Sequence, residues 1–400
     1  MSAAAAPHYR QPLLRSPFAV RAQDFVQTDA YLQWSGYSTV DVFSSVEQEY
    51  FAIRNACSLY DLTPMIKYRI AGTEAEAYLN RLVTRNVTRL KPGRVAYTVW
   101  CNDAGHVIDD GTVFRLAPDE FRLCTAERQL DWLLDSAIGF QVEIEEVTEA
   151  VAALSLQGPT ACATLKALGL PGIENLKPFE LVQAAVDSIA LLVSRTGFTG
   201  DLGYELWLDP ADAVALWDRL MVAGRPHGLR PVGWAAVNMA RIEAGFIQLN
   251  IDFVSAEHTI RTGRDRSPFE LGLDWLVDLA KGHFTGRRAL VADQARGPAR
   301  RLVGLDIEGN KPAEHALLYA EKSCRRQIGT VSSALWSPTC KRNLALAMIE
   351  APYFKASAEI WAEIYLNREL VWERRTARAR IVERPFFAPE RRKAVPAGDR

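Results

Sequence analysis

The sequence predicts a mixed α+β protein of two or three packed units that ends in a small β-barrel. Its 400 residues are more than a single hydrophobic core usually fills. Two units of strand followed by helix occur before Pro298, and beyond it the pattern changes to short strands separated by turns. This order favours an α+β region followed by a barrel over an array of repeats.

The first strand and helix lie between residues 68 and 83. Tyr68–Ile70 is typical of the end of a strand, and Thr73–Glu76 matches a capping box. Apolar residues then recur at helical spacing, at Tyr78, Leu79, Leu82 and Val83. We therefore expect an amphipathic helix directly after the capping box.

The second unit begins with two buried strands, Ser188–Ser194 and Tyr204–Leu208. Asp209 and Pro210 are a typical helix start, and Gly224 is a typical helix end. The apolar positions between them fit one helix face: Val214, Leu216, Trp217, Leu220 and Met221.

The last third of the chain predicts the barrel. Five short strands are expected, at Leu302–Ile307, Gln327–Ser332, Leu344–Ile349, Glu359–Leu366 and Arg374–Val382. The expected organisation is a loose tail over residues 1–21, an α+β region of two subdomains over 22–295, a barrel over 300–388 and a loose tail over 389–400.

Composition excludes several classes of protein. With 47 Lys+Arg against 48 Asp+Glu, the formal charge of -1 offers no excess for binding nucleic acid. The six cysteines are scattered, without the spacing of a zinc site or a disulfide framework, so no metal is expected. No signal peptide or membrane-spanning run is present, and we expect a cytoplasmic protein with no membrane partner.

Two adjacent carboxylates, Asp109 and Asp110, follow the turn Asn102–Gly105. Neighbours on a strand point to opposite faces, so only one of them can enter a given pocket. The alternative is an ordinary acidic turn.

A glycine-rich loop, Arg195–Gly203, precedes Glu205. Its glycines fit neither a dinucleotide fingerprint nor a phosphate loop. Such a loop can lie close to a flat ligand while Glu205 accepts paired hydrogen bonds from an amino-heterocycle. A solvated carboxylate at the edge of a strand is the alternative.

A third candidate segment, Asn238–Gly245, fits a helix with Met239 and Ile242 on its apolar side. Arg241 and Glu243 would then form a solvated charged pair on the polar face.

A series of short segments, including these candidates, occurs in a recognisable order between Val46 and Phe387. They are Val46–Tyr50, Tyr60–Met65, Tyr78–Leu82, Asn86–Val87, Ala96–Tyr97, Val107–Asp110, Leu156–Pro159, Arg195–Glu205, Arg241–Gly245, Phe284–Leu290 and Ser337–Thr339. Together they resemble the family of the glycine-cleavage T-protein and its tetrahydrofolate-dependent demethylase relatives.

The resemblance implies a three-part, cloverleaf-like fold around a central funnel that holds tetrahydrofolate. It matches Asp109 with a catalytic aspartate near the reactive folate nitrogens, Glu205 with the carboxylate that grips the pterin edge, and Arg241 with an arginine near the site. The remaining expected cofactor contacts are wall residues: Met65, Tyr97 and Phe198.

Three departures from T-proteins bear on the reaction. Val237-Asn238 stands in place of Arg-Asp, Cys124–Arg128 lacks an asparagine that T-proteins tend to supply, and His283 replaces the cysteine of iron-sulfur-repair relatives. We therefore expect a methyltransferase of the demethylase branch that moves a methyl group from a small O-, S- or N-methylated compound to tetrahydrofolate without a carrier protein. The alternatives are aminomethyl transfer from a lipoyl carrier protein and a non-catalytic folate-binding accessory role.

Overall fold

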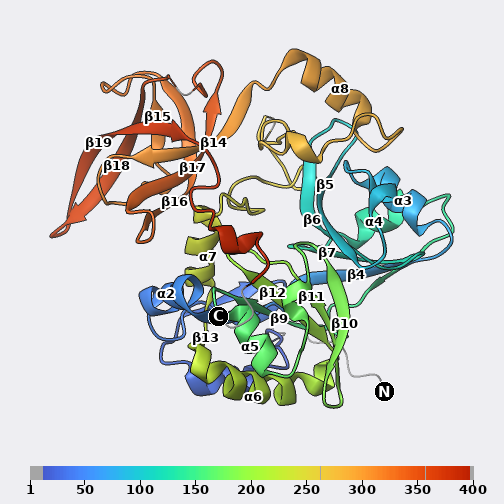
Figure 1. Ribbon diagram of the computed structural model, residues 1–400. Helices are drawn as coiled ribbons and strands as arrows, with labels where there is room; N and C mark the ends of the chain where they lie inside the picture. The colour runs from blue at the N-terminus through green and yellow to red at the C-terminus, as the bar shows by residue number, and fades with distance from the viewer. Residues whose placement is uncertain (1–11, 262, 356, 397–400) are drawn as a thin grey trace, which may run out of the picture.

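Three lobes surround a common centre in the computed structural model, which describes residues 12–261, 263–355 and 357–396 (Figure 1). The first two lobes combine sheets with helices, and the third is a closed barrel. The expected three-part α+β fold with a C-terminal β-barrel is confirmed.

The first lobe contains a six-stranded sheet in the order β10-β11-β12-β9-β3-β13. Its strands are β3 (Cys57–Asp61), β9 (Ala152–Gln157), β10 (Leu181–Val186), β11 (Ile189–Ser194), β12 (Gly203–Leu208) and β13 (Leu229–Pro231). Helices pack on both faces: α2 (Val46–Asn55), α5 (Ala161–Ala167), α6 (Ala213–Gly224) and α7 (Trp234–Glu243). Because β9 is central, all of its residues are buried.

The predicted α6 is confirmed. Asp209 accepts a hydrogen bond from the Ala211 amide, and the 3-10 turn Pro210–Asp212 leads into the helix. Side chains such as Leu216 and Leu220 are fully buried against the sheet, as their spacing predicts.

The second lobe has a five-stranded sheet in the order β5-β6-β7-β4-β8. Its elements are β4 (Ile66–Ala71), β5 (Arg94–Cys101), β6 (Val107–Ala117), β7 (Glu120–Thr125), β8 (Glu143–Glu146), α3 (Ala75–Leu82) and α4 (Leu130–Ser136). The capping box expected at Thr73–Glu76 is wrong. The α3 helix starts at Ala75 with Glu74 at its N-cap and no side-chain cap bond.

The third lobe is a closed barrel with strand order β14-β17-β16-β15-β18-β19. The strands are β14 (Arg300–Ile307), β15 (Leu317–Tyr319), β16 (Gln327–Ser337), β17 (Arg342–Glu350), β18 (Ile360–Arg368) and β19 (Val371–Val382). The expectation of five strands misses β15, because three residues are too short to show an alternating pattern.

Both ends of the described chain pack on the body. Phe18 has no exposed surface and Leu14 bridges to Tyr37, so residues 12–21 are held in place. Arg391 forms an ion pair with Asp201, 2.6 Å between Nε and Oδ1, which fixes the segment after the barrel. The remainder of each expected loose tail, residues 1–11 and 397–400, lies outside the described residues.

Short elements connect the lobes. The remaining helices and strands are α1 (Ala19–Ala22), β1 (Tyr31–Trp34), β2 (Tyr37–Val40) and α8 (Arg287–Arg296). The other 3-10 turns are η2 (Gln23–Phe25), η3 (Val87–Arg89), η4 (Ile173–Asn175), η6 (Arg225–His227), η7 (Asp274–Leu276) and η8 (Glu390–Arg392). In the described part of the chain, no helix combines the length and apolar character needed to span a bilayer.

Candidate functional site

The second-lobe sheet supplies a tyrosine and a carboxylate that are bonded to each other. Tyr97 on β5 donates its hydroxyl to Asp110 Oδ2 on β6 at 2.7 Å, and both side chains are half-buried. Burial raises the pKa of Asp110 to about 6. Burial and the Asp110 carboxylate also hold the pKa of Tyr97 well above its usual range.

Asp109, the predicted catalytic residue, is completely buried beside this pair. Its Oδ1 accepts the Asp110 amide at 2.8 Å, while its Oδ2 has no hydrogen-bond partner within the described chain. Burial, followed by the charge of Asp110, raises the pKa of Asp109 well above the usual range of an aspartate. Burial therefore favours the neutral form of the Asp109 carboxyl group over its carboxylate.

The first-lobe sheet supplies Glu205, which lies on β12 opposite Ser194 and Ser155. Thr196 donates its hydroxyl to Glu205 Oε2 at 2.5 Å. Burial raises the pKa of Glu205 to about 7, and the bonds from Thr196 and Ser194 oppose that rise. A half-buried carboxylate with one occupied oxygen can accept further N–H donors.

The two sheets bring these groups to one region. Residues directly opposite each other in antiparallel strands share a face of the sheet. Tyr97 lies opposite Thr112, and Thr112 lies opposite Cys124, so these three side chains are on one face of the second-lobe sheet. Burial raises the pKa of Cys124 to about 12, and the charge of Glu205 adds to that rise. Phe114, on the Tyr97 face of β6, packs against Trp207 with 5.2 Å between ring centroids. Glu205 shares the Trp207 face of β12, so Glu205 lies on the side of the first-lobe sheet that meets the face carrying Tyr97.

Arg241 is held by protein groups near the same region. Its Nη1 forms an ion pair with Asp252 at 2.5 Å, and Nε donates to Asn238 Oδ1 at 2.8 Å. The guanidinium also donates to Ser333 of the barrel at 2.8 Å. Asp252 adds to the raised pKa of Asp110, so its charge acts on the carboxylate bonded to Tyr97.

The expectation of a solvated pair on α7 is wrong. Arg241 is 1% exposed and Glu243 is 0% exposed, because α7 packs between α2 and the barrel. Glu243 bonds Arg54 of α2 and Ser337 of β16 instead of water.

Apolar and aromatic side chains lie around the polar groups. Met65 and Phe198 are half-buried and pack against one hydrophobic cluster, which also contains Trp207. The ring of Phe198 stacks on Phe246, with 5.6 Å between centroids and 18° between planes. Contact of folate with Met65, Tyr97, Asp109, Phe198, Glu205 or Arg241 stays a prediction.

Three residues of this region were missed by sequence reasoning. Thr196 lies within the glycine-rich loop that precedes Glu205. It follows Ser194 by two residues, and the two hydroxyls are hydrogen-bonded to each other, so this spacing could have indicated that both lie near Glu205. Asp110, to which the resemblance gives no role, is bonded by Tyr97. Asp252 carries no local signal, since its partner Arg241 is joined only by the fold.

Comparisons with known proteins agree with the fold. The family described as the GCVT N-terminal domain matches residues 20–281, and the glycine cleavage T-protein C-terminal barrel domain matches residues 300–388. The aminomethyltransferase T of Bartonella henselae shares the fold, with a TM-score of 0.82 over 94% of this chain and 98% of that chain at 24% identity.

Curated relatives extend the comparison to sequence. The aminomethyltransferase of Caldanaerobacter subterraneus subsp. tengcongensis is 31% identical over 89% of this chain and 91% of its own length. The trimethylamine-oxide aldolase of Ruegeria pomeroyi is 34% identical over 83% of this chain and 43% of its own length. The chain therefore belongs to the glycine-cleavage T-protein family, and it is a one-carbon transferase that uses tetrahydrofolate as the acceptor.

Proposed function

We propose that this enzyme is an aminomethyltransferase, which takes an aminomethyl group from a carrier sulfur, passes its carbon to tetrahydrofolate and releases ammonia and the carrier thiol. Relatives named aminomethyltransferase, aligned over 89% of the chain, support this reaction better than the methyl transfer expected from the sequence. The single structural observation that carries the proposal is Asp109, a buried carboxyl group with an unpartnered oxygen.

The residues present fit tetrahydrofolate. Glu205 can accept the paired N–H groups of a pterin edge, since Thr196 occupies only one of its oxygens. Tyr97, Met65 and Phe198 offer half-buried surface for a flat ring. When bound, tetrahydrofolate supplies the nitrogens that take the carbon.

Asp110 shares the face of β6 that carries Tyr97, whereas Asp109 points to the opposite face, so we assign the proton transfer to the Asp109–Asp110 pair as a whole. The carbon leaves its sulfur as the thiol and its nitrogen as ammonia, each of which takes up a proton, while the two folate nitrogens that receive the carbon each lose one. A carboxyl group whose pKa is raised by burial can give protons to the leaving groups and accept them from the folate nitrogens. The 2.7 Å hydrogen bond between Tyr97 and Asp110 fixes the orientation of both side chains beside the site of proton transfer.

Methyl transfer remains a second candidate because of Asn238. This neutral amide accepts from Arg241 Nε, where T-proteins carry an aspartate. The substitution removes one negative charge beside the site, which is a departure specific to this chain.

One experiment separates the two reactions. The enzyme is incubated with tetrahydrofolate and either a lipoylated carrier protein bearing an aminomethyl group or a panel of small methylated donors. Mass spectrometry then distinguishes methylene- from 5-methyl-tetrahydrofolate. We expect methylene-tetrahydrofolate from the carrier, whereas 5-methyl-tetrahydrofolate from a methylated donor alone would establish methyl transfer instead.

A further inference from the structure

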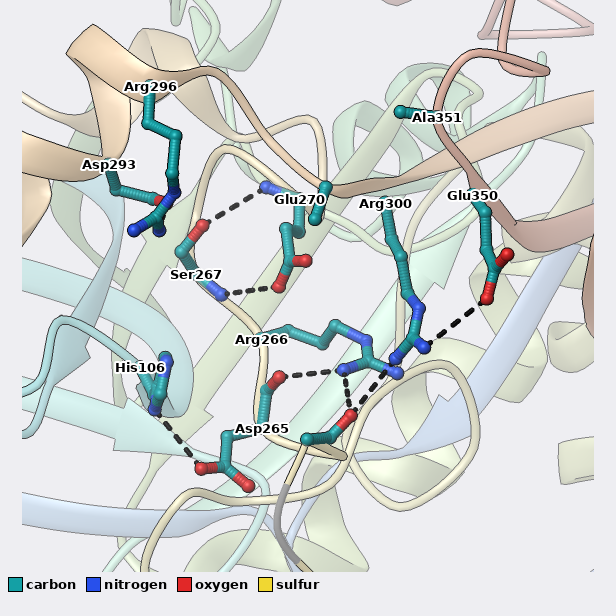
Figure 2. Close-up of a pocket in the computed structure, with 12 residues that line it drawn as sticks. His106, Asp265, Arg266, Ser267, Glu270, Asp293, Arg296, Arg300, Glu350 and Ala351 are labelled. Carbon is teal, nitrogen blue, oxygen red and sulfur yellow. Dashed lines mark hydrogen bonds and ion pairs between the residues drawn. The ribbon is translucent and has the colours of Figure 1, made fainter.

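A polar cleft of about 410 Å³ lies apart from Glu205 and Tyr97 (Figure 2). It is formed where the loop of residues 263–270 meets α8 and the start of β14. The loop is attached to β6, since Val107 donates its amide to the carbonyl of Arg266 at 2.8 Å. The cleft thus adjoins the strand that carries Asp109 without including any of the proposed folate contacts.

Two guanidinium groups meet inside the cleft. Arg266 Nη1 and Arg300 Nη1 donate to the same carbonyl, that of Gly263, at 2.9 and 3.1 Å. Figure 2 shows both side chains converging on this point from different segments. Like charges held this close repel each other unless an anion lies between them.

Each acidic side chain in the cleft has a partner, but Asp265 Oδ1 and Asp293 Oδ2 are buried without one in the described part of the chain. Asp265 bonds His106 at 3.1 Å, Asp293 bonds Arg296 at 2.5 Å, and Glu350 lies 3.4 Å from Arg300. Glu270 accepts the Ser267 amide at 3.3 Å.

Arg266 differs from the other arginines of the cleft. Among the residues that the structure describes, its hydrogen bonds go to the backbone carbonyls of Gly263 and Asp265, and it has no ion pair. Burial lowers its pKa, the charge of Glu270 opposes that shift, and the charge of Arg300 adds to it. Because no carboxylate of the described residues bonds its half-buried guanidinium directly, an anion placed against it would recover part of the free energy that burial costs.

We propose that this cleft is a binding site for a small oxyanion, a carboxylate or a phosphate, which lies between Arg266 and Arg300. A planar guanidinium fork matches both groups through paired N–H donors. Arg266 spends Nη1 on backbone carbonyls, so its Nε and Nη2 remain to bind the ligand. Arg300 Nη2 donates to Glu350, and the ligand would share or displace that contact.

The test is isothermal titration of the full chain, at low ionic strength, with sodium phosphate and separately with sodium acetate. We expect saturable binding of at least one anion, weakened at least about tenfold in Arg266→Gln and in Arg300→Gln, since each variant loses a charged hydrogen bond. Arg230→Gln is the matched control, because it removes the same charge from an exposed position on β13 in the first lobe. Preference between the two anions identifies the ligand as a phosphate or a carboxylate compound.

Arg266 also holds its own loop, so Arg266→Gln can disturb the fold. The variants Arg300→Gln and Arg300→Lys then test the proposal. Lysine keeps the positive charge but lacks the paired N–H donors of a guanidinium, so the anion affinity of Arg300→Lys should lie between those of wild type and Arg300→Gln. The proposal is overturned if neither anion binds saturably, or if the Arg300 variants bind like wild type. It is also overturned if Arg230→Gln weakens binding as much as they do.

Discussion

Two adjacent carboxyl groups on β6 meet different surroundings. Asp110 is bonded by the hydroxyl of Tyr97, whereas Asp109 keeps one buried oxygen without a partner. Because neighbouring residues of a strand point to opposite faces, a single ligand atom cannot contact both carboxyl groups equally. Their roles can therefore be separated by matched substitutions.

We predict that Asp109→Asn lowers kcat by about 10² to 10⁴, the usual effect of removing an acid/base group, and changes tetrahydrofolate affinity much less. Asp110→Asn should lower kcat less, because Tyr97 can still bond the amide oxygen. Steady-state kinetics and calorimetry on both variants give the two quantities. Full activity in Asp109→Asn would mean that the pair only positions the substrate.

The carboxyl group of Glu205 should make folate binding depend on pH. Its pKa is raised to about 7, so the protein without ligand carries a neutral carboxyl group below that pH and a carboxylate above it. The charged form is the better acceptor for pterin N–H groups. We expect tetrahydrofolate affinity measured by calorimetry to fall as pH drops from about 8 to about 6.

Glu205→Gln supplies the control for that titration. It should weaken binding at pH 8 by roughly 1.5–3 kcal/mol, the range for a hydrogen bond to a charged group, and flatten the pH profile. Stability should change in the opposite sense. Because the folded pKa of Glu205 exceeds its unfolded value, the folded state binds the extra proton, and wild type loses stability as pH rises toward 7. An unchanged profile in Glu205→Gln would remove Glu205 from the site.

At the scale of single elements, local sequence predicts well where the structure depends on neighbours in the chain. Asp209 caps the 3-10 turn Pro210–Asp212, and α6 continues from that turn at Ala213. The start of α3 was misplaced because Thr73–Glu76 forms no side-chain cap. A local sequence pattern can indicate a cap, but packing of the segment against the sheet determines at which residue the helix begins.

Charges on α7 show the limit of such reasoning. Periodicity identifies the helix, but Arg241 and Glu243 were expected in water. Their partners, Asp252 and Arg54, come from other parts of the fold, so no local spacing could have shown their burial. The same holds for the site. The order of the sequence motifs identifies Tyr97 and Glu205. The placement of Asp252, whose charge raises the pKa of Asp110, depends on tertiary structure alone.

At the scale of the whole molecule, Glu243 joins the first lobe to the barrel. Its Oε2 accepts Arg54 Nη2 of α2 at 2.6 Å, and its Oε1 accepts the hydroxyls of Tyr50 and of Ser337 in the barrel. The backbone carbonyl of Glu243 also accepts the amides of Phe386 and Phe387 at 2.9 Å. One buried residue thus ties α2, α7, the barrel and the segment that leaves it (Figure 1).

We predict that Glu243→Ala lowers the free energy of unfolding by about 3–5 kcal/mol, because it leaves the buried Arg54 charge without its main partner. Glu243→Gln should cost less, since the amide oxygen still accepts one donor. The control Glu314→Ala changes an exposed residue and should stay within about 0.5 kcal/mol of wild type. Denaturant unfolding measures all three. If Glu243→Ala unfolds with the same midpoint as Glu314→Ala, the lobes must be held together by apolar packing rather than by this charged junction.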